Sequence, residues 1–145
     1  MIEESERRRV IVVLVIGAVL MAAFWTAWYA DRSLVASNTR SAYYEFENAF
    51  PLADGWLTVA LIGAAWTLRR RSPLALFWLL AGGGAGLYLF GMDVLYDLEN
   101  SIWWKSGAGG LIELAINVLT LVVSLWLLRW AWQRREPLLA ARSGL

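Results

Sequence analysis

Four long apolar segments dominate the pattern of hydrophobic and polar positions along the chain. They cover residues 10–30, 52–68, 73–92 and 111–132. Each can cross about 30 Å of hydrocarbon as a helix, which takes roughly 20 residues. The strict alternation that marks a strand is missing from all four, and a closed barrel needs many more segments. The sequence therefore predicts an all-α, polytopic membrane protein, with residues 1–145 forming a single four-transmembrane-helix bundle.

The longest polar connection is the loop at residues 31–51, between the first two predicted spans. Its aromatic residues stand beside acidic ones, in the order Tyr43, Tyr44, Glu45, Phe46, Glu47 and Phe50. This composition suits an amphipathic segment lying on a membrane surface. It fits a mobile lid and a fixed cover equally well.

Composition agrees with lipid as the solvent of this chain. Hydrophobic residues make up 59% of the sequence and the mean hydropathy is +0.52, whereas a soluble domain is about 45–50% apolar. Cysteine and histidine are both absent. Their absence excludes disulfides, thiol redox chemistry, Cys/His zinc sites and a histidine general base. The first apolar run is longer than the core of a usual signal peptide, so we expect it to remain as a span.

Basic residues show which side of the membrane each end faces. Ten of the 13 lie on one face of the predicted bundle, namely Arg7, Arg8, Arg9, Arg69, Arg70, Arg71, Arg129, Arg134, Arg135 and Arg142. The other face holds Arg32, Arg40 and Lys105. The positive-inside rule then places both termini in the cytoplasm. We interpret the arginine triplets as topology signals, so the lipid bilayer is the expected partner and nucleic acid is not.

Acidic residues have the opposite bias, with eight of the 12 in the outer half. At 1.5 Å per helical residue, Asp54, Glu113 and Asn117 fall about 7, 5 and 11 Å below the outer hydrocarbon boundary. Asp93 falls at the boundary. An ionised aspartate at mid-bilayer costs roughly 2.5–3.5 kcal/mol on insertion scales. We therefore expect these groups to face the bundle interior, where they are paired, hydrated or protonated.

Helical spacing places these polar residues on common faces. Glu113 and Asn117 stand at i and i+4, and so do Asp54 and Thr58. The sequence thus predicts an acidic cup open to the outside. Its walls are Asp54, Asp93 and Glu113, its floor is Thr58, Asn117 and Thr120, and its mouth holds Tyr96, Asp97 and Asn100.

Oxygen ligands of this kind suit hard cations such as Ca²⁺, Mg²⁺ or Mn²⁺. We therefore predict that the cup binds a cation or a small polar ligand, with Asp54, Asp93 and Glu113 as the candidate metal ligands. No EF-hand or other specific metal-binding spacing accompanies them.

Two strings of the sequence carry a resemblance. Phe50-Pro51-Leu52-Ala53-Asp54 and Met92-Asp93-Val94-Leu95-Tyr96-Asp97-Leu98-Glu99-Asn100 resemble those of a group of small bacterial four-helix integral membrane proteins with no known activity. The resemblance covers the chain from the first loop to the fourth span. It implies the four-helix fold and a bacterial inner membrane, and it implies no function.

Other functions fit the same residues. The polar groups could form a purely structural network, with Lys105 or Arg40 as counter-ion, in a structural or partner-binding subunit. Crowded carboxylates could also supply a general acid in a lipid-modifying membrane enzyme, although we favour a protein without catalysis. A transport path would need several copies, because four helices seldom enclose a pore.

Four glycines in the third predicted span, Gly82, Gly83, Gly84 and Gly86, favour close helix packing. We expect that packing inside one chain rather than in a homodimer. A second copy or a membrane partner protein stays open as a binding partner.

Overall fold

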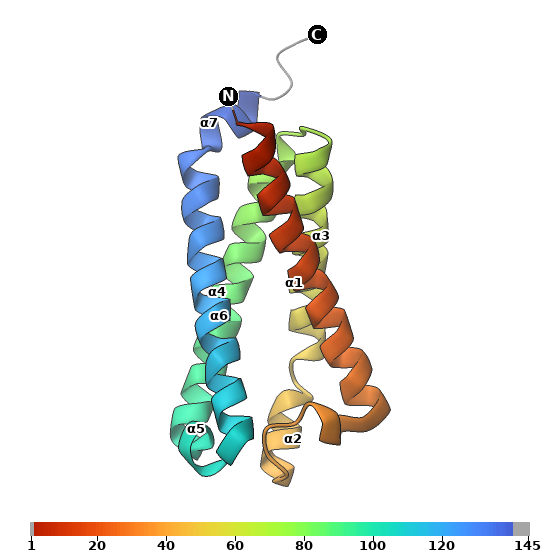
Figure 1. The fold of residues 1–145 in the computed structure, drawn as a ribbon, viewed down its shortest axis with the longest axis vertical. Helices are drawn as coiled ribbons and strands as arrows, with labels where there is room; N and C mark the ends of the chain where they lie inside the picture. The colour runs from red at the N-terminus through yellow and green to blue at the C-terminus, as the bar shows by residue number, and fades with distance from the viewer. Residues whose placement is uncertain (1, 141–145) are drawn as a thin grey trace.

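Four long helices make up most of the molecule, in a computed structural model that describes residues 2–140 (Figure 1). They are α1 (Glu4–Asp31), α3 (Pro51–Arg69), α4 (Leu74–Asn100) and α6 (Gly107–Gln133). Between and after them lie a 3-10 turn η1 (Arg32–Leu34) and the short helices α2 (Ser41–Glu47), α5 (Ile102–Lys105) and α7 (Arg135–Leu139). Within the described residues, four helices are long and apolar enough to cross a membrane and no strand occurs. The prediction of an all-α protein with four such helices is confirmed.

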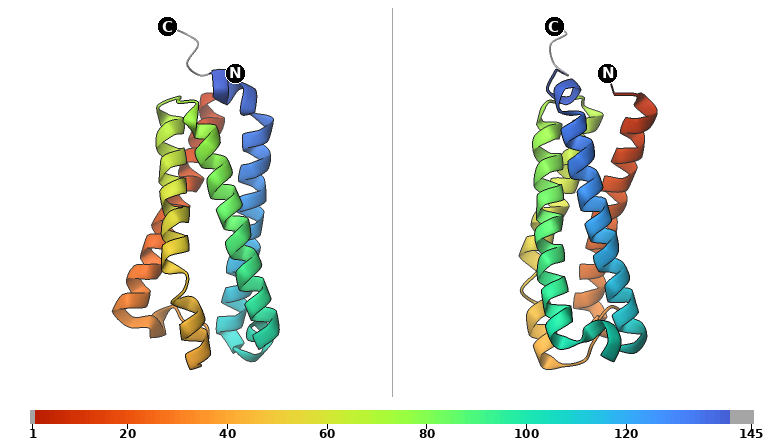
Figure 2. Two further views of the ribbon diagram at one scale, coloured as in Figure 1. Left: turned by 180° about the vertical axis from the view of Figure 1, so that it is seen from behind. Right: turned by 90° about the vertical axis from the view of Figure 1, so that its left-hand side faces the viewer.

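The long helices pack in the order α1, α3, α4, α6, with each helix against the next. The start of α1, the turn between α3 and α4, and α7 lie together at one end, which we call the terminal end (Figures 1 and 2). The opposite end, with η1, α2 and α5, we call the loop end. Towards the loop end α1 runs obliquely away from α6, and α2 lies at that end of the bundle (Figure 1).

Glycines set the distance between α4 and its two neighbours. A Cβ added at Gly83 would lie 2.6 Å from Cγ of Leu128 on α6, and one at Gly82 would lie 3.6 Å from Cβ of Ala60 on α3. A Cβ at Gly84 would meet nothing within 4 Å. The glycine run therefore serves close packing inside the chain, as the sequence predicts, because the helix backbones approach where side chains are missing.

The outward faces of the long helices are apolar. Large side chains such as Val19 and Leu20 on α1, Ile62 on α3 and Val122 on α6 are more than half exposed. Large exposed hydrophobic residues occur on all four long helices, which is unfavourable in water. This surface is typical of a protein that sits in lipid.

Candidate functional site

Five carboxylates from four helices gather at the loop end of the bundle. This carboxylate cluster consists of Glu47 on α2, Asp54 on α3, Asp93 and Asp97 on α4, and Glu113 on α6. Glu47 interacts electrostatically with Glu113, Asp93 and Asp54, and Asp93 interacts with Glu113, Asp54 and Asp97. The structure thus brings Asp54, Asp93 and Glu113 into one neighbourhood, as the helical spacing predicts, and adds Glu47 and Asp97.

Asp97 is the most buried member of the cluster. It is 2% exposed, and its Oδ2 atom accepts two hydrogen bonds of 2.7 Å, from Nδ2 of Asn117 and from Nε1 of Trp103. The sequence predicts Asp97 at the mouth of the cup, and the structure shows its side chain buried between α4, α5 and α6. The chain reverses at Ser101, which has a left-handed backbone (φ 59°), and α5 then brings Trp103 to Asp97.

Asp54 and Glu113 each accept a hydrogen bond from an uncharged donor. Nε1 of Trp25 on α1 donates to Oδ2 of Asp54 at 2.9 Å, which joins α1 to the first turn of α3. The first turn is a favourable place for an acid because the helix dipole is positive there. The hydroxyl of Ser37, in the loop after η1, donates to Oε2 of Glu113 on α6.

Glu47 is a functional candidate that the sequence interpretation missed. It is 8% exposed, whereas an acidic residue in a polar loop is expected to face water. A signal was present, because Tyr43, Phe46, Glu47 and Phe50 stand at i, i+3, i+4 and i+7 and so share one helical face. Tyr43 on α2 is also buried, and so is Phe50 just after the helix, which makes the Tyr43–Glu47 face of α2 its inner face, with an acid on it.

Three other predicted residues are placed differently from the predicted cup. Tyr96 stacks on Phe46 with ring centroids 3.8 Å apart, so it joins α2 to α4. Nδ2 of Asn100 donates to the carbonyl oxygen of Tyr96 at 3.0 Å, and Oγ1 of Thr58 donates to the carbonyl oxygen of Asp54 at 2.8 Å. Asn100 and Thr58 therefore bond to the backbone of their own helices.

No basic side chain neutralises the cluster within residues 2–140. The ion pairs in this part of the chain use Glu4, Glu6 and Glu136, all at the terminal end. Arg40 and Lys105, the counter-ions that the sequence suggested for a structural network, form none of them. The hydrogen bonds to Asp54, Asp97 and Glu113 come from neutral groups, which satisfy lone pairs and leave the charge uncompensated.

Asn117 also lacks one partner, because its side-chain oxygen has no hydrogen-bond donor. Its side chain is 2% exposed, and while Nδ2 is bonded to Asp97, Oδ1 has no hydrogen-bond partner. Asn117 lies one turn from Glu113 on α6. A buried acceptor without a donor costs about 1–3 kcal/mol. Since the surrounding groups are carboxylates, which are also acceptors when ionised, only a donor or a cation can satisfy them all.

A compact metal site is not formed by these side chains. Among residues 2–140, no three acidic side chains approach one another closely enough to hold a metal ion. The structure therefore does not assemble Asp54, Asp93 and Glu113 into the three-ligand site that the sequence predicts. A cavity of about 570 Å³ opens at the loop end, but its lining includes Trp28, Arg32 and Asn48 and none of the cluster.

Comparison with protein families, with curated proteins and with solved structures finds no match for this chain.

Proposed function

We propose that this chain is a bacterial inner-membrane protein that binds a cationic ligand in the carboxylate cluster. Both termini are cytoplasmic and the loop end faces outward. The orientation rests on the basic residues. The sequence assigns ten of the 13 to the face that carries the termini. The ligand class rests on one observation: five carboxylates between the helices have no basic partner in the described residues.

Electrostatics requires that something compensate these groups. Removing one partner from a buried ion pair typically costs 3–5 kcal/mol, because it leaves an uncompensated charge, and here several acids stand together. Protons or a bound cation can supply the missing positive charge. The free Oδ1 of Asn117 favours a ligand that donates hydrogen bonds. Because no three acids converge on one point, a hydrated ion or an organic ammonium fits better than a bare metal ion.

The test is thermal unfolding of the purified protein in neutral detergent, at constant ionic strength. The added probes are CaCl₂, MgCl₂, MnCl₂ and spermidine, each against a matched NaCl control. A ligand present at 100 times its Kd stabilises the folded state by about 2.7 kcal/mol. We expect a rise in Tm with at least one probe, and we expect Asp93→Asn and Glu113→Gln to reduce it.

The control variant is Glu99→Gln, which removes an exposed acid from α4 outside the cluster. It should keep the full response to the probe. If no probe raises Tm, and Asp93→Asn and Glu113→Gln are more stable than the original chain, the cluster is a protonated structural network. The protein would then be a structural or partner-binding subunit and the cation proposal would fail.

A further inference from the structure

The terminal end holds a second polar site, and its charge is opposite to that of the cluster. A cavity of about 370 Å³ lies where α1, the α3–α4 turn, the start of α4 and α7 meet. Its polar lining is Arg7, Arg71 and Ser72, and apolar residues such as Leu68, Ala75 and Leu138 form the rest. A cavity with two guanidinium groups on one side and aliphatic walls on the other matches an anionic headgroup attached to an acyl chain.

Both guanidinium groups already point at one anionic oxygen. Nη1 of Arg7 lies 3.1 Å and Nη2 of Arg71 lies 3.2 Å from the same atom, Oε2 of Glu4. The Glu4 side chain is 71% exposed, so this pairing is weak and easily exchanged. The carboxylate oxygen thus marks a position where an oxygen of a phosphate group would contact both arginines.

Arg71 has a backbone conformation that glycine would adopt more easily, which suggests that its side chain is needed. The end of α3 is a Schellman motif, in which N of Arg71 donates to O of Leu68 at 3.1 Å and N of Ser72 donates to O of Thr67 at 2.9 Å. Arg71 occupies the left-handed position (φ 52°), where glycine is usual and another residue costs roughly 1–2 kcal/mol. An arginine is held at a position whose backbone favours glycine.

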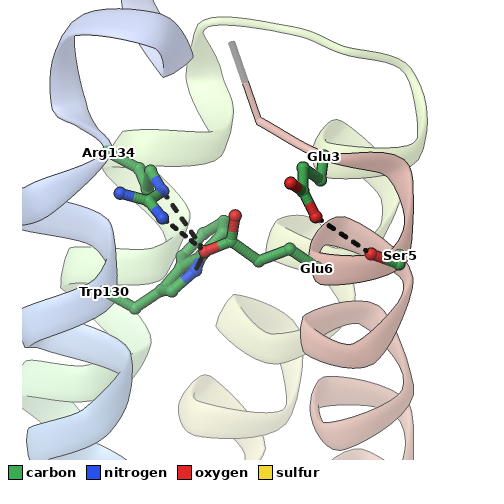
Figure 3. Close-up of polar contacts among 5 residues, drawn as sticks. All are labelled: Glu3, Ser5, Glu6, Trp130 and Arg134. Carbon is green, nitrogen blue, oxygen red and sulfur yellow. Dashed lines mark hydrogen bonds and ion pairs between the residues drawn. The ribbon is translucent and has the colours of Figure 1, made fainter.

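A third arginine at this end is paired with a different acid. Arg134, on the other side of the α1 terminus, bonds to Oε1 of Glu6 through Nη2 at 3.0 Å and Nε at 3.2 Å, and Nε1 of Trp130 donates to the same atom at 2.7 Å (Figure 3). Glu6 thus pairs with Trp130 and Arg134, whereas Glu4 pairs with Arg7 and Arg71 through a side chain that is 71% exposed. We propose that the cavity beside Arg7 and Arg71 binds the phosphate group of an anionic lipid in the leaflet at the terminal end.

The experiment measures thermal unfolding of the full chain in neutral detergent at fixed ionic strength. The probes are dioctanoyl phosphatidylglycerol, dioctanoyl phosphatidylcholine and sodium phosphate. We expect phosphatidylglycerol to raise Tm more than either of the others. Arg7→Gln and Arg71→Gly should weaken its apparent affinity about tenfold, which is the usual scale for one charge-assisted hydrogen bond. Arg71→Gly also keeps the turn, since glycine suits the left-handed position.

Two matched controls separate a specific site from general attraction to negative lipid. Arg69→Gln removes the same charge from the exposed end of α3 and should change the affinity less than about threefold. Glu4→Gln frees both guanidinium groups and should tighten binding, whereas Glu136→Gln makes the same charge change on α7 and should not.

The proposal would be overturned if Arg69→Gln and Arg71→Gly lowered the apparent affinity for phosphatidylglycerol equally. It would also be overturned if Glu136→Gln and Glu4→Gln raised that affinity equally. A phosphatidylglycerol shift that persists in Arg7→Gln and Arg71→Gly would overturn it as well. A shift of the same size with sodium phosphate alone would retain the phosphate chemistry and reject the lipid as its source. None of these results depends on the carboxylate cluster at the other end.

Discussion

At the scale of single residues, tryptophans hold acids at both ends of the bundle. The indole N–H donates to a carboxylate in three pairs, Trp25 to Asp54 at 2.9 Å, Trp103 to Asp97 at 2.7 Å and Trp130 to Glu6 at 2.7 Å. Amphipathic tryptophans are usual where helices leave the hydrocarbon. Here they also satisfy carboxylate lone pairs without adding positive charge. The two pairs at the loop end therefore fix the positions of Asp54 and Asp97 without neutralising them.

The pair of Asp97 with Asn117 gives the first prediction. Asp97→Asn should lower the free energy of unfolding by about 1–3 kcal/mol, because a neutral amide oxygen accepts more weakly and its NH₂ group is buried beside other donors. The measurement is thermal unfolding in detergent, with Glu99→Gln as the exposed control on the same helix. Equal stability of the two variants would show that the hydrogen bonds of Asp97 contribute little.

At the scale of helices, the glycines of α4 give a paired prediction. Gly83→Ala places a Cβ 2.6 Å from Cγ of Leu128, so α4 and α6 must separate, and a loss of about 1–3 kcal/mol is expected. Gly84→Ala meets nothing within 4 Å and should be neutral or slightly stabilising, since alanine favours the helix. Thermal unfolding of both variants tests this, and equal behaviour would contradict the close α4–α6 packing.

The contact of the first loop with α6 gives a prediction about dynamics. Ser37 bonds to Glu113, and Nδ2 of Asn38 donates to Oγ of Ser106 at 2.9 Å, so the loop after η1 is tied to the start of α6. Ser37→Ala should speed amide hydrogen exchange in α2, because local opening then breaks fewer contacts. Ser33→Ala removes a hydroxyl that bonds only to nearby Asp31 and serves as the control.

If exchange in α2 is the same in Ser37→Ala and Ser33→Ala, the Ser37–Glu113 hydrogen bond does not hold the loop. Tyr43 and Phe46 would then be the residues that fix it, through the rings of Trp28 and Tyr96. The outcome therefore decides which set of contacts holds this loop against the bundle.

Long helices were predictable from the sequence because length and hydropathy determine them directly. The site was only partly predictable. Helical spacing identified Asp54, Asp93 and Glu113 as neighbours, but it did not reveal the burial of Asp97, since Trp103 reaches it through a turn at Ser101 that no sequence preference marks. The helical spacing of Tyr43, Phe46 and Glu47 did mark the inner face of α2, but an acid in a polar loop is ordinarily expected to face water, so Glu47 was missed.

At the scale of the whole molecule, charge is separated along the bundle axis. The terminal end carries most of the arginines and the ion pairs, whereas the loop end carries the carboxylate cluster, which has no basic ion-pair partner in residues 2–140. A membrane with a negative cytoplasmic surface would orient such a molecule with its terminal end inward. The cluster would then open only to the outer solution, and the phosphate site would lie in the inner leaflet.

This arrangement predicts how the chain is labelled in intact cells. The sequence contains no cysteine, so single cysteines can be introduced without background. Glu45→Cys on α2 should react with a membrane-impermeant maleimide added outside, whereas Glu136→Cys on α7 should react only after permeabilisation, because both sites are exposed but lie at opposite ends. Glu99→Cys repeats the loop-end test on a different helix and should follow Glu45→Cys. Labelling with the sides exchanged would invert the orientation and place the proposed cation site on the cytoplasmic side. Equal labelling of Glu45→Cys and Glu136→Cys from one side would mean that the four helices do not span the membrane, because a spanning bundle keeps its two ends on opposite sides.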